Sequence, residues 1–525
     1  MPKVFISDKL SPRGLEVFAE RGVEAEMRPG LDAVALAAAL TGADGLVVRS
    51  GTQVTAELLA AAPDIKVVGR AGIGIDNVDL AAATAHGIVV MNTPYGNSVT
   101  TAEHTISMLM ALARQIPQAD RSTQAGEWAK SRFMGVELCQ KVLGVVGCGN
   151  IGAIVASLAQ GLRMRVIAND PYLSPEHAQE LGVEKVEFDE LLARADFVSL
   201  HTPLTDQTRH LIDADAIARM KPGARLVNCA RGGLVDEAAL KTAIEGGQLA
   251  GAALDVFEIE PATDSSLFGM DSIVATPHLG AATAEAQENV AEQIAEQISE
   301  FLLTGAVSNA LNMPSVSAEE APRLKPYLQL AKHLGSFAGQ LTERGLREAR
   351  IEYEGHVAGL NTKPLTAICL EGLLSPLMES VNMVNAPVVA RERNINVSEV
   401  RHDRPSDYQT LIRLTVVTER QERTVAGTLF AGSRPRLVEV KGIPIEAELS
   451  PHMLYVTNED KPGLIGSLGQ VLGEARVNIA TFHLGRAAPG GDAIALIQVD
   501  DPVPDAVLKR VRALPHIIQV KALHF

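Results

Sequence analysis

Three residues in the middle of the chain have the types needed to oxidise a hydroxy acid: Arg231, Glu260 and His278. A histidine can take the hydroxyl proton because its ordinary pKa is about 6.5. A glutamate can orient that histidine and support its positive charge, and an arginine can hold a carboxylate with two hydrogen bonds. A single loop arginine or histidine is more often structural. The prediction of a catalytic site therefore depends on all three, each of which follows an apolar run.

A glycine-rich turn precedes these residues. Gly147, Gly149 and Gly152 follow an apolar run at 142–146 and open an apolar helical pattern. Gly147 permits a tight turn, Gly149 lets a pyrophosphate approach the backbone, and Gly152 lets the helix pack on the strand. Asp170 lies at about the ~20-residue spacing expected for a ribose ligand, without an arginine beside it, which favours NAD over NADP. The alternative is a glycine-rich turn without a ligand.

Two arginines, Arg49 and Arg70, end apolar runs in the first hundred residues. If those runs are parallel strands, both side chains lie at one edge and suit a phosphate or a distal carboxylate. His201, Thr202 and Pro203 follow another such run, at 197–200. The alternatives are surface salt bridges for the arginines and a loop histidine without contacts for His201.

The elements that position these residues follow from hydrophobic patterning. Apolar runs alternate with helical patterns up to residue 281, which predicts parallel sheets covered by helices. Long helices are expected at 98–114 and 282–303, and the Pro-, Ser- and Glu-rich segment 309–326 is typical of a linker. From Met453 the order strand, helix, strand, strand, helix, strand predicts a ferredoxin-like domain. Strands before it are expected at 4–6, 45–48, 66–69, 87–90, 142–146, 165–168, 197–200, 225–228, 251–255 and 272–275.

Composition narrows the class of protein. A length of 525 residues suggests three or four domains at about 100–200 residues each. The net charge of −16 argues against nucleic acid or an anionic membrane as the main partner. Four cysteines without zinc-ligand spacing, no signal-peptide pattern and no long apolar run favour a cytoplasmic protein without a metal.

Several segments taken together resemble the D-isomer-specific 2-hydroxyacid dehydrogenases, and within that family the long form with a C-terminal ACT domain. They are residues 69–79, the glycine turn, 230–236, 255–261 and 277–280. The resemblance implies NAD-dependent oxidation of 3-phospho-D-glycerate to 3-phosphohydroxypyruvate, the first step of L-serine biosynthesis. Reduction of another 2-oxo acid (2-oxoglutarate, hydroxypyruvate or glyoxylate) and an NAD-sensing binding protein without activity are the alternatives.

The resemblance also implies roles for individual residues. Arg231, Glu260 and His278 are the expected catalytic residues. Arg132 is expected to reach the substrate of a partner subunit. The expected cofactor contacts are Ile73, Gly147, Gly149, Asn150, Ile151, Gly152, Asp170, His201, Thr202, Pro203, Cys229, Ala230, Arg231, Asp255, His278, Leu279, Gly280 and Ala281. The expected substrate contacts are Arg49, Ser50, Arg70, Gly72, Arg132, Arg231 and His278.

The C-terminal segment is similar to an ACT domain, a sensor of small molecules that pairs across subunits. Asp460 precedes a predicted helix and Asn478 precedes a predicted strand, and the resemblance implies that they bind an amino acid such as serine. Asn458 stands where some members of the family have a tyrosine, so serine binding is open. A dimerisation module without a ligand is the alternative.

The expected fold class is α/β, with two Rossmann-like doubly wound domains, an intervening α+β domain and a C-terminal ferredoxin-like ACT domain. We expect residues 1–96 with 282–312 to form a discontinuous, flavodoxin-like substrate-binding domain and residues 97–281 to form the NAD-binding domain. Residues 313–450 would be the intervening regulatory domain and 451–525 the ACT domain. A homodimer or homotetramer is expected by resemblance, with a small anionic substrate as partner.

Overall fold

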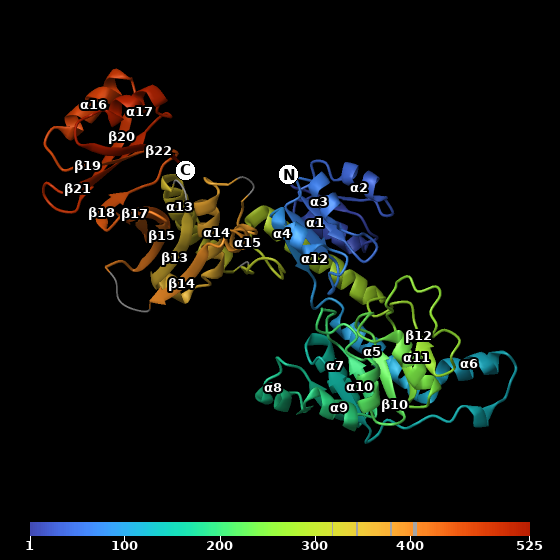
Figure 1. Ribbon diagram of the computed structural model, residues 1–525. Coiled ribbons are helices and arrows are strands. Elements are labelled where there is room, and N and C mark those ends of the chain that lie inside the picture. Colours follow the sequence, from blue (N-terminus) through green and yellow to red (C-terminus); the bar gives the residue numbers. More distant parts are fainter. Residues whose placement is uncertain (318, 343–344, 379–380, 403–406) are drawn as a thin grey trace.

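The computed structural model describes residues 1–525 except 318, 343–344, 379–380 and 403–406. Within these residues, sheets of five, seven, six and four strands follow one another along the chain (Figure 1). The first two sheets are parallel, while the last two are mixed and antiparallel. The predicted α/β fold class, with a ferredoxin-like C-terminal unit, is confirmed.

The first sheet has the strand order β2-β1-β3-β4-β5, which is the flavodoxin-like order. Its central strands are buried because helices cover both faces. The sequence analysis missed β2, a short edge strand with two glutamates, and placed the start of β5 two residues too early. The elements are β1 (Lys3–Ile6), α1 (Pro12–Glu20), β2 (Glu24–Met27), α2 (Ala33–Ala39), β3 (Gly45–Val48), α3 (Ala56–Ala61), β4 (Val67–Arg70), α4 (Leu80–Ala85) and β5 (Val89–Asn92).

The second sheet has the order β12-β11-β10-β9-β6-β7-β8. The chain starts in the middle at β6, moves one way to β8 and then crosses back through β9 to β12. Such a reversal leaves a crevice at the carboxyl ends of the strands. The elements are β6 (Val142–Val146), α7 (Asn150–Gly161), β7 (Arg165–Asn169), α8 (Pro175–Glu180), β8 (Glu184–Lys185), α9 (Phe188–Arg194), β9 (Phe197–Leu200), α10 (Ala214–Arg219), β10 (Ala224–Asn228), α11 (Glu237–Glu245), β11 (Leu249–Leu254) and β12 (Ile273–Ala275).

Two long helices connect the first two sheets. Helix α5 (Ser98–Arg114) carries the chain from β5 to the second sheet, and its buried face packs on α7 and β11. Helix α12 (Ala284–Thr304) carries the chain back, and Ile294 and Ile298 enter the core of the first unit. After α5, helix α6 (Ile116–Gln124) and the short helix η1 (Lys130–Arg132) extend away from the second unit (Figure 1).

The predicted linker at 309–326 is wrong in two respects. The backbone N–H of Leu311 donates to Val90 O at 2.9 Å, and Asn312 binds the backbone of Ile88 and Val90, so this part packs against β5. Residues 321–326 then belong to helix α13 (Ala321–Leu341). Pro322 lies in its first turn, where a missing N–H costs little. Proline content alone therefore did not indicate an exposed connection.

The last two sheets share a continuous core. Phe337 of α13 packs edge-to-face on Tyr455 of the fourth sheet at 5.7 Å, within one buried cluster. The elements of the third unit are β13 (Leu346–Gly355), η2 (His356–Gly359), α14 (Lys363–Leu374), α15 (Ala386–Glu392), β14 (Asn396–His402), β15 (Thr410–Thr418), β16 (Glu422–Phe430), β17 (Arg434–Val440) and β18 (Ile443–Ala447). Those of the fourth unit are β19 (His452–Glu459), α16 (Leu464–Glu474), β20 (Ile479–Arg486), β21 (Asp492–Val499), α17 (Asp505–Arg512) and β22 (Ile517–His524), the predicted order.

In the part of the chain that the structure describes, no helix combines the length and the apolar character needed to cross a membrane.

Candidate active site

The residues that sequence analysis selected follow five strands of the second sheet at the same edge. Gly147 follows β6, His201 follows β9, Arg231 follows β10, Asp255 follows β11 and His278 follows β12. All of these strands are parallel, so their carboxyl ends meet. The structure therefore brings together segments that lie far apart in the sequence.

His278 and Glu260 form a direct hydrogen-bonded pair, with 2.7 Å between Nδ1 and Oε2. The second oxygen of Glu260 accepts the backbone N–H of Phe257 at 3.1 Å. Burial opposes ionisation of Glu260, but the hydrogen bond and charge of His278 and the Phe257 N–H outweigh it, so the pKa of Glu260 is lowered. A carboxylate can only accept, so Nδ1 carries the hydrogen in the neutral ring. Nε2 is then the nitrogen that can take a proton.

Asp255 organises the turn that carries His278. Its side chain has no exposed surface, and its oxygens accept the backbone N–H groups of Leu279 at 2.8 Å and Gly280 at 2.9 Å. Asp255 O also accepts the N–H of His278 at 2.8 Å. The Asp255 carboxylate is therefore bound by groups of the protein itself. Because the side chain has no exposed surface, a direct cofactor contact by Asp255 would require the surrounding residues to move.

Arg231 reaches across to the first unit. Its Nε donates to Asp76 at 2.8 Å, and its Nη1 donates to Ala230 O at 2.6 Å. The guanidinium lies over Gly74, where a Cβ atom would sit 1.5 Å from Nη2. A glycine at position 74 is therefore required for this close approach. A substrate carboxylate that took both Nε and Nη2 would replace Asp76.

Arg49 and Arg70 lie side by side because Val48 of β3 pairs with Arg70 of β4. Burial lowers the pKa of Arg70 to about 10, and repulsion from Arg231 and Arg49 adds to the shift, while Asp76 and Asp8 oppose it. Among the described residues, Arg70 Nε is buried without a hydrogen-bond partner. A half-buried cation with cationic neighbours and an unpaired donor favours binding of an anion.

Two polar residues to which sequence analysis gave no role, Asp8 and Asn77, hold the loop after β3. Asp8 accepts the N–H groups of Arg49 at 2.6 Å and Thr52 at 3.2 Å. Asn77 donates to Arg49 O and Thr52 O, both at 2.6 Å. Ser50 lies between these anchors on the surface. Asp8 closely follows the apolar strand β1, a signal that could have identified it.

The glycine turn has the shape of a dinucleotide site. Gly147 has φ +88°, and a Cβ at Gly152 would lie 2.0 Å from Gly147 O, so neither position accepts a side chain. A Cβ at Gly149 would meet no protein atom within 4 Å, so the space above it is open. Helix α7 begins at Asn150 without a side-chain cap, and Thr202 Oγ1 is buried without a partner among the described residues. Free N–H groups, open space and an unpaired hydroxyl fit a pyrophosphate.

Three more of the predicted cofactor residues, Asp170, His201 and Cys229, lie in the second unit. Asp170 accepts the N–H of Cys148 at 2.8 Å and that of Tyr172 at 2.7 Å, which keeps its carboxylate beside the turn. Burial lowers the pKa of His201 to about 4, so its ring, bound to Ser199 at 2.8 Å, is neutral at neutral pH. Burial raises the pKa of the Cys229 thiol to about 12, so it is also neutral.

Of the predicted substrate residues, Gly72 lies at the arginine cluster and Arg132 does not. A Cβ at Gly72 would lie 1.8 Å from Arg70 Nη1, so Gly72 is in direct contact with the arginine cluster. Arg132 instead pairs with Asp271 at 3.0 Å and approaches Glu127 at 4.0 Å. The structure does not bring Arg132 to the arginine cluster of its own chain. Its predicted role requires a second subunit.

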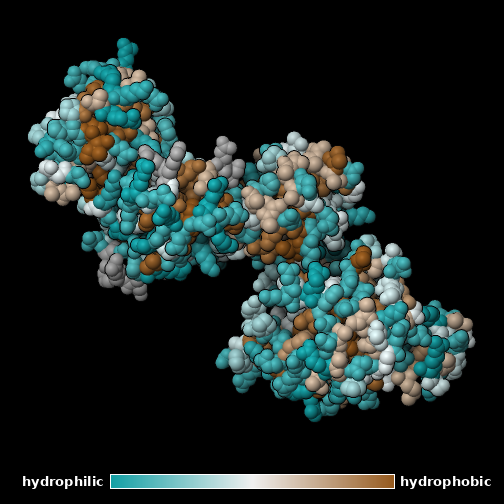
Figure 2. Space-filling view, in the orientation of Figure 1, coloured by the Kyte–Doolittle hydropathy of each residue, from teal (hydrophilic) through white to brown (hydrophobic). Residues whose placement is uncertain are grey.

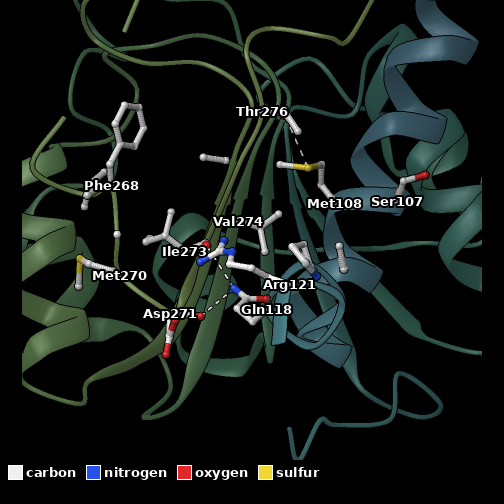
Figure 3. Close-up of a pocket in the computed structure, with 15 residues that line it drawn as sticks. Ser107, Met108, Gln118, Arg121, Phe268, Met270, Asp271, Ile273, Val274 and Thr276 are labelled. Carbon is white, nitrogen blue, oxygen red and sulfur yellow. Dashed lines mark hydrogen bonds between the residues drawn. The ribbon is translucent and has the colours of Figure 1, made fainter. Parts of the chain in front are cut away.

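A cavity of about 500 Å³ lies beside this site but is separate from the Arg231–Glu260–His278 group. Figure 3 shows it between α5, α6 and the segment that leads into β12, with Gln118, Asp271 and Ile273 on its wall. Thr276 lines it as well, and contacts Met108 Sδ at 3.6 Å.

The two predicted effector residues are engaged within the chain. Asp460 accepts the N–H of Gly490 at 3.1 Å and Nη1 of Arg486 at 3.0 Å, and these bonds lower its pKa. Asn478 donates to Asp500 at 2.7 Å. The structure does not bring Asp460 and Asn478 into contact. Sequence analysis missed Arg486, a cation beside Asp460 that suits a carboxylate.

Comparisons with known proteins agree with this arrangement. Residues 106–280 match the D-isomer specific 2-hydroxyacid dehydrogenase NAD binding domain, 323–441 the D-3-phosphoglycerate dehydrogenase intervening domain, and 452–516 the ACT domain. The chain is 41% identical to D-3-phosphoglycerate dehydrogenase of Bacillus subtilis (strain 168) over 525 residues, which cover 100% of this chain and 99% of that protein. The chain belongs to the D-3-phosphoglycerate dehydrogenase family.

Other members and a solved structure extend the comparison. The family member from Methanocaldococcus jannaschii is 40% identical over 526 residues and covers 100% of both chains. The solved D-lactate dehydrogenase from Aquifex aeolicus, complexed with NAD and lactic acid, is 27% identical with a TM-score of 0.53. It covers 60% of this chain and is itself covered completely. This phosphoglycerate dehydrogenase family member is therefore an NAD-dependent dehydrogenase.

Proposed function

We propose that the protein oxidises 3-phospho-D-glycerate to 3-phosphohydroxypyruvate with NAD, the first step of L-serine biosynthesis. The observation that carries this proposal is the cluster of Arg49, Arg70 and Arg231 in a chain that holds the His278–Glu260 pair. Burial and then the neighbouring Arg231 and Arg49 lower the pKa of Arg70, and its Nε has no hydrogen-bond partner among the described residues, so a bound anion would stabilise the cluster. A substrate with an anion at each end would supply that charge. The named relatives support the same substrate.

The protein side of the reaction divides into binding and proton transfer. Arg231 holds the carboxylate next to the reacting carbon, while Arg49 and Arg70 hold the phosphate, with Ser50 and Gly72 beside them. His278 takes the hydroxyl proton at Nε2 and returns it in the reverse direction. Glu260 stabilises the positive charge that forms on the ring.

The cofactor half of the site has a separate task. When bound, NAD would supply the hydride acceptor for the oxidation at C2 of the substrate, while His278 takes the hydroxyl proton. The N–H groups at the start of α7, around Asn150 and Ile151, suit the pyrophosphate, and Asp170 suits the ribose. Ile73, Pro203, Cys229, Ala230, Leu279, Gly280 and Ala281 are the remaining proposed contacts.

Turnover with purified protein tests the proposal. NADH formation is followed by absorbance with 3-phospho-D-glycerate, D-glycerate and 2-hydroxyglutarate as separate substrates. We expect kcat/KM to be highest for the phosphorylated acid. A higher kcat/KM for either of the other acids would show that the arginines serve a different anion, and binding of NADH without any turnover would favour an NAD-sensing protein.

We also propose that the protein is a cytoplasmic homo-oligomer. Each subunit would have a substrate-binding domain (1–96 with 282–312), an NAD-binding domain (97–281), an intervening domain (313–450) and an ACT domain (451–525). Trp128 and Met134, beyond α6, are 88% and 76% exposed, which suits an arm that packs on a second subunit. Figure 2 shows apolar side chains gathered on the C-terminal unit, which suits ACT domain pairing. Asp460 and Asn478 would bind an amino acid such as serine at that pairing.

A further inference from the structure

Helix α5 contacts the turn that carries His278 through two side chains. Thr101 Oγ1 donates to Gly280 O at 2.8 Å. One turn further along, His104 Nε2 lies 3.1 Å from Asp255 Oδ1 and 3.3 Å from Thr276 Oγ1. Thr276 also donates to Asp255 Oδ1 at 2.5 Å. The helix and the turn are therefore joined through the Asp255 carboxylate.

The position of the His278 ring depends on this carboxylate. Asp255 accepts the two consecutive backbone N–H groups that follow His278, those of Leu279 and Gly280. His278 itself has φ +55°, in the left-handed region that a non-glycine residue adopts only when its surroundings impose it. The hydrogen bonds of Asp255 supply such a constraint. A shift of the carboxylate would therefore shift the histidine.

His104 is the basic residue that contacts this carboxylate, and Cys229 and Glu260 also interact with its charge. A fully buried carboxylate costs free energy unless hydrogen bonds and an opposite charge compensate. Burial opposes ionisation of Asp255, but His104, Thr276 and the Leu279 N–H together lower its pKa. The His104 imidazole therefore helps to keep Asp255 ionised. An ionised carboxylate accepts hydrogen bonds at both oxygens, as the N–H groups of Leu279 and Gly280 require.

Helix α5 is also the connection between the first and second units. It follows β5 of the first sheet, and Thr100 in its first turn lies 3.4 Å from Thr283, the N-cap of the returning helix α12. The contact of His104 therefore links the histidine turn to the helix between the units. Arg231 likewise joins the two units through Asp76.

We propose that His104 is a positioning residue for hydride transfer, which holds Asp255 in the place that fixes the His278 turn on α5. This inference rests on the proposed function, because it assigns His104 to the same reaction. His104 itself contacts Asp255 and Thr276, residues of the turn and its support. Its loss should therefore lower kcat by a larger factor than it raises the KM for 3-phospho-D-glycerate.

The experiment compares His104→Leu, which removes the hydrogen bond, with His104→Gln, which can restore a donor. We expect kcat to fall about 10- to 100-fold in the leucine variant, since a displacement near 1 Å can cost that much. The glutamine variant should recover to within about threefold of the wild type. His177→Leu is the matched control, because His177 is an exposed helical histidine paired with Glu180.

Hydrogen exchange measured by mass spectrometry on residues 276–281 gives a readout independent of activity. The Leu279 and Gly280 amides should exchange faster in His104→Leu than in the wild type and in His104→Gln. A kcat within twofold of the wild type in His104→Leu, or an equal loss in both variants, would overturn the inference. If the wild type fails to oxidise 3-phospho-D-glycerate, the proposed function fails, while the exchange data still report on the positioning of the turn.

Discussion

A histidine–glutamate pair is not sufficient for catalysis, because this chain contains two of them near the same edge. His278 bonds Glu260 at 2.7 Å, and His210 bonds Glu258 at 2.8 Å. The second pair joins two loops and, within the part of the chain that the structure describes, its residues bond Gly233 and Glu237 rather than Asp255 or the arginine cluster. At the scale of single residues, function comes from the neighbours of the pair, which are Arg231 and the Asp255-supported turn.

This contrast gives a matched prediction for the acid–base residue. His278→Ala should lower kcat by about 10²- to 10⁴-fold, because the hydroxyl proton loses its acceptor. His210→Ala removes the same chemical group from the other pair and should leave kcat within about twofold. Steady-state kinetics at fixed pH measure both. A near-normal rate in His278→Ala would remove that residue from the proposed mechanism.

Arg70 carries the phosphate preference in the proposed mechanism. Arg70→Gln should raise the KM for 3-phospho-D-glycerate about 10- to 100-fold, because a hydrogen bond to a charged group contributes about 1.5–3 kcal/mol. The effect on D-glycerate, which has no phosphate, should be much smaller. Arg28→Gln, which alters an arginine at the end of β2 that pairs with Glu26, is the control. Equal losses with both substrates would place Arg70 outside the phosphate site.

At the scale of elements, the glycine turn contains two glycines that the backbone fold requires and one that faces the proposed ligand site. Nearby backbone atoms leave no space for a side chain at Gly147 or Gly152, whereas Gly149 faces open space. Gly149→Ala should therefore fold normally, with an unchanged thermal midpoint.

The same variant should bind NADH about 5- to 100-fold more weakly, because the added methyl group takes space above the turn. Fluorescence titration with NADH measures this change. Gly161→Ala, at the other end of α7 and also free of neighbours within 4 Å, should leave NADH binding unchanged. Tight NADH binding by Gly149→Ala would contradict the proposed position of the pyrophosphate.

Hydrophobic patterning predicted most elements because buried parallel strands are nearly all apolar. Strand β2 escaped this rule, since an edge strand with alternating glutamates resembles a loop. The segment 321–326 also escaped it, because its prolines indicated a break while Leu324 lies in the core with Ala321 packed against it. Long-range packing, which composition does not encode, decided both cases.

The same limit applies to the site. Residues that follow strands, such as Arg231 and His278, could be selected because topology places all strand ends at one edge. His104 acts through hydrogen bonds between distant segments, and no local pattern marks it. Asp8 follows an apolar strand and Asn77 lies in a selected segment, but their hydrogen bonds to the loop after β3 depend on how distant segments meet. Asp76 lay within a selected segment, but its contact with Arg231 depends on how the two units meet.

At the scale of the whole molecule, the C-terminal half is attached to the first unit by defined contacts. Asn382 donates to Gly87 O and Asn385 to Ala85 O, both at 3.1 Å, and Val384 enters the core of the first unit. The intervening and ACT units share the core around Phe337 and Tyr455. Packed contacts through the intervening unit therefore connect the ACT domain with the first unit.

The proposed amino-acid site can be tested on the intact chain. If serine binds at Asp460, saturating serine should raise the thermal midpoint by a few degrees, since a ligand at 100 times Kd adds about 2.7 kcal/mol. Asp460→Ala should abolish that rise, while Asp505→Ala, an exposed carboxylate on α17, should retain it. A rise that survives in Asp460→Ala would place the ligand elsewhere, and no rise with any amino acid would favour a purely structural ACT domain.

The central claim is that a hydride leaves C2 of a phosphorylated 2-hydroxy acid for NAD at this site. Its most direct test is the mass of the NADH formed from 3-phospho-D-glycerate that carries deuterium at C2. We expect the deuterium to appear in the reduced cofactor and turnover to be strongly reduced in His278→Ala. Unlabelled NADH, or no reduced cofactor from the wild-type protein, would contradict hydride transfer from C2.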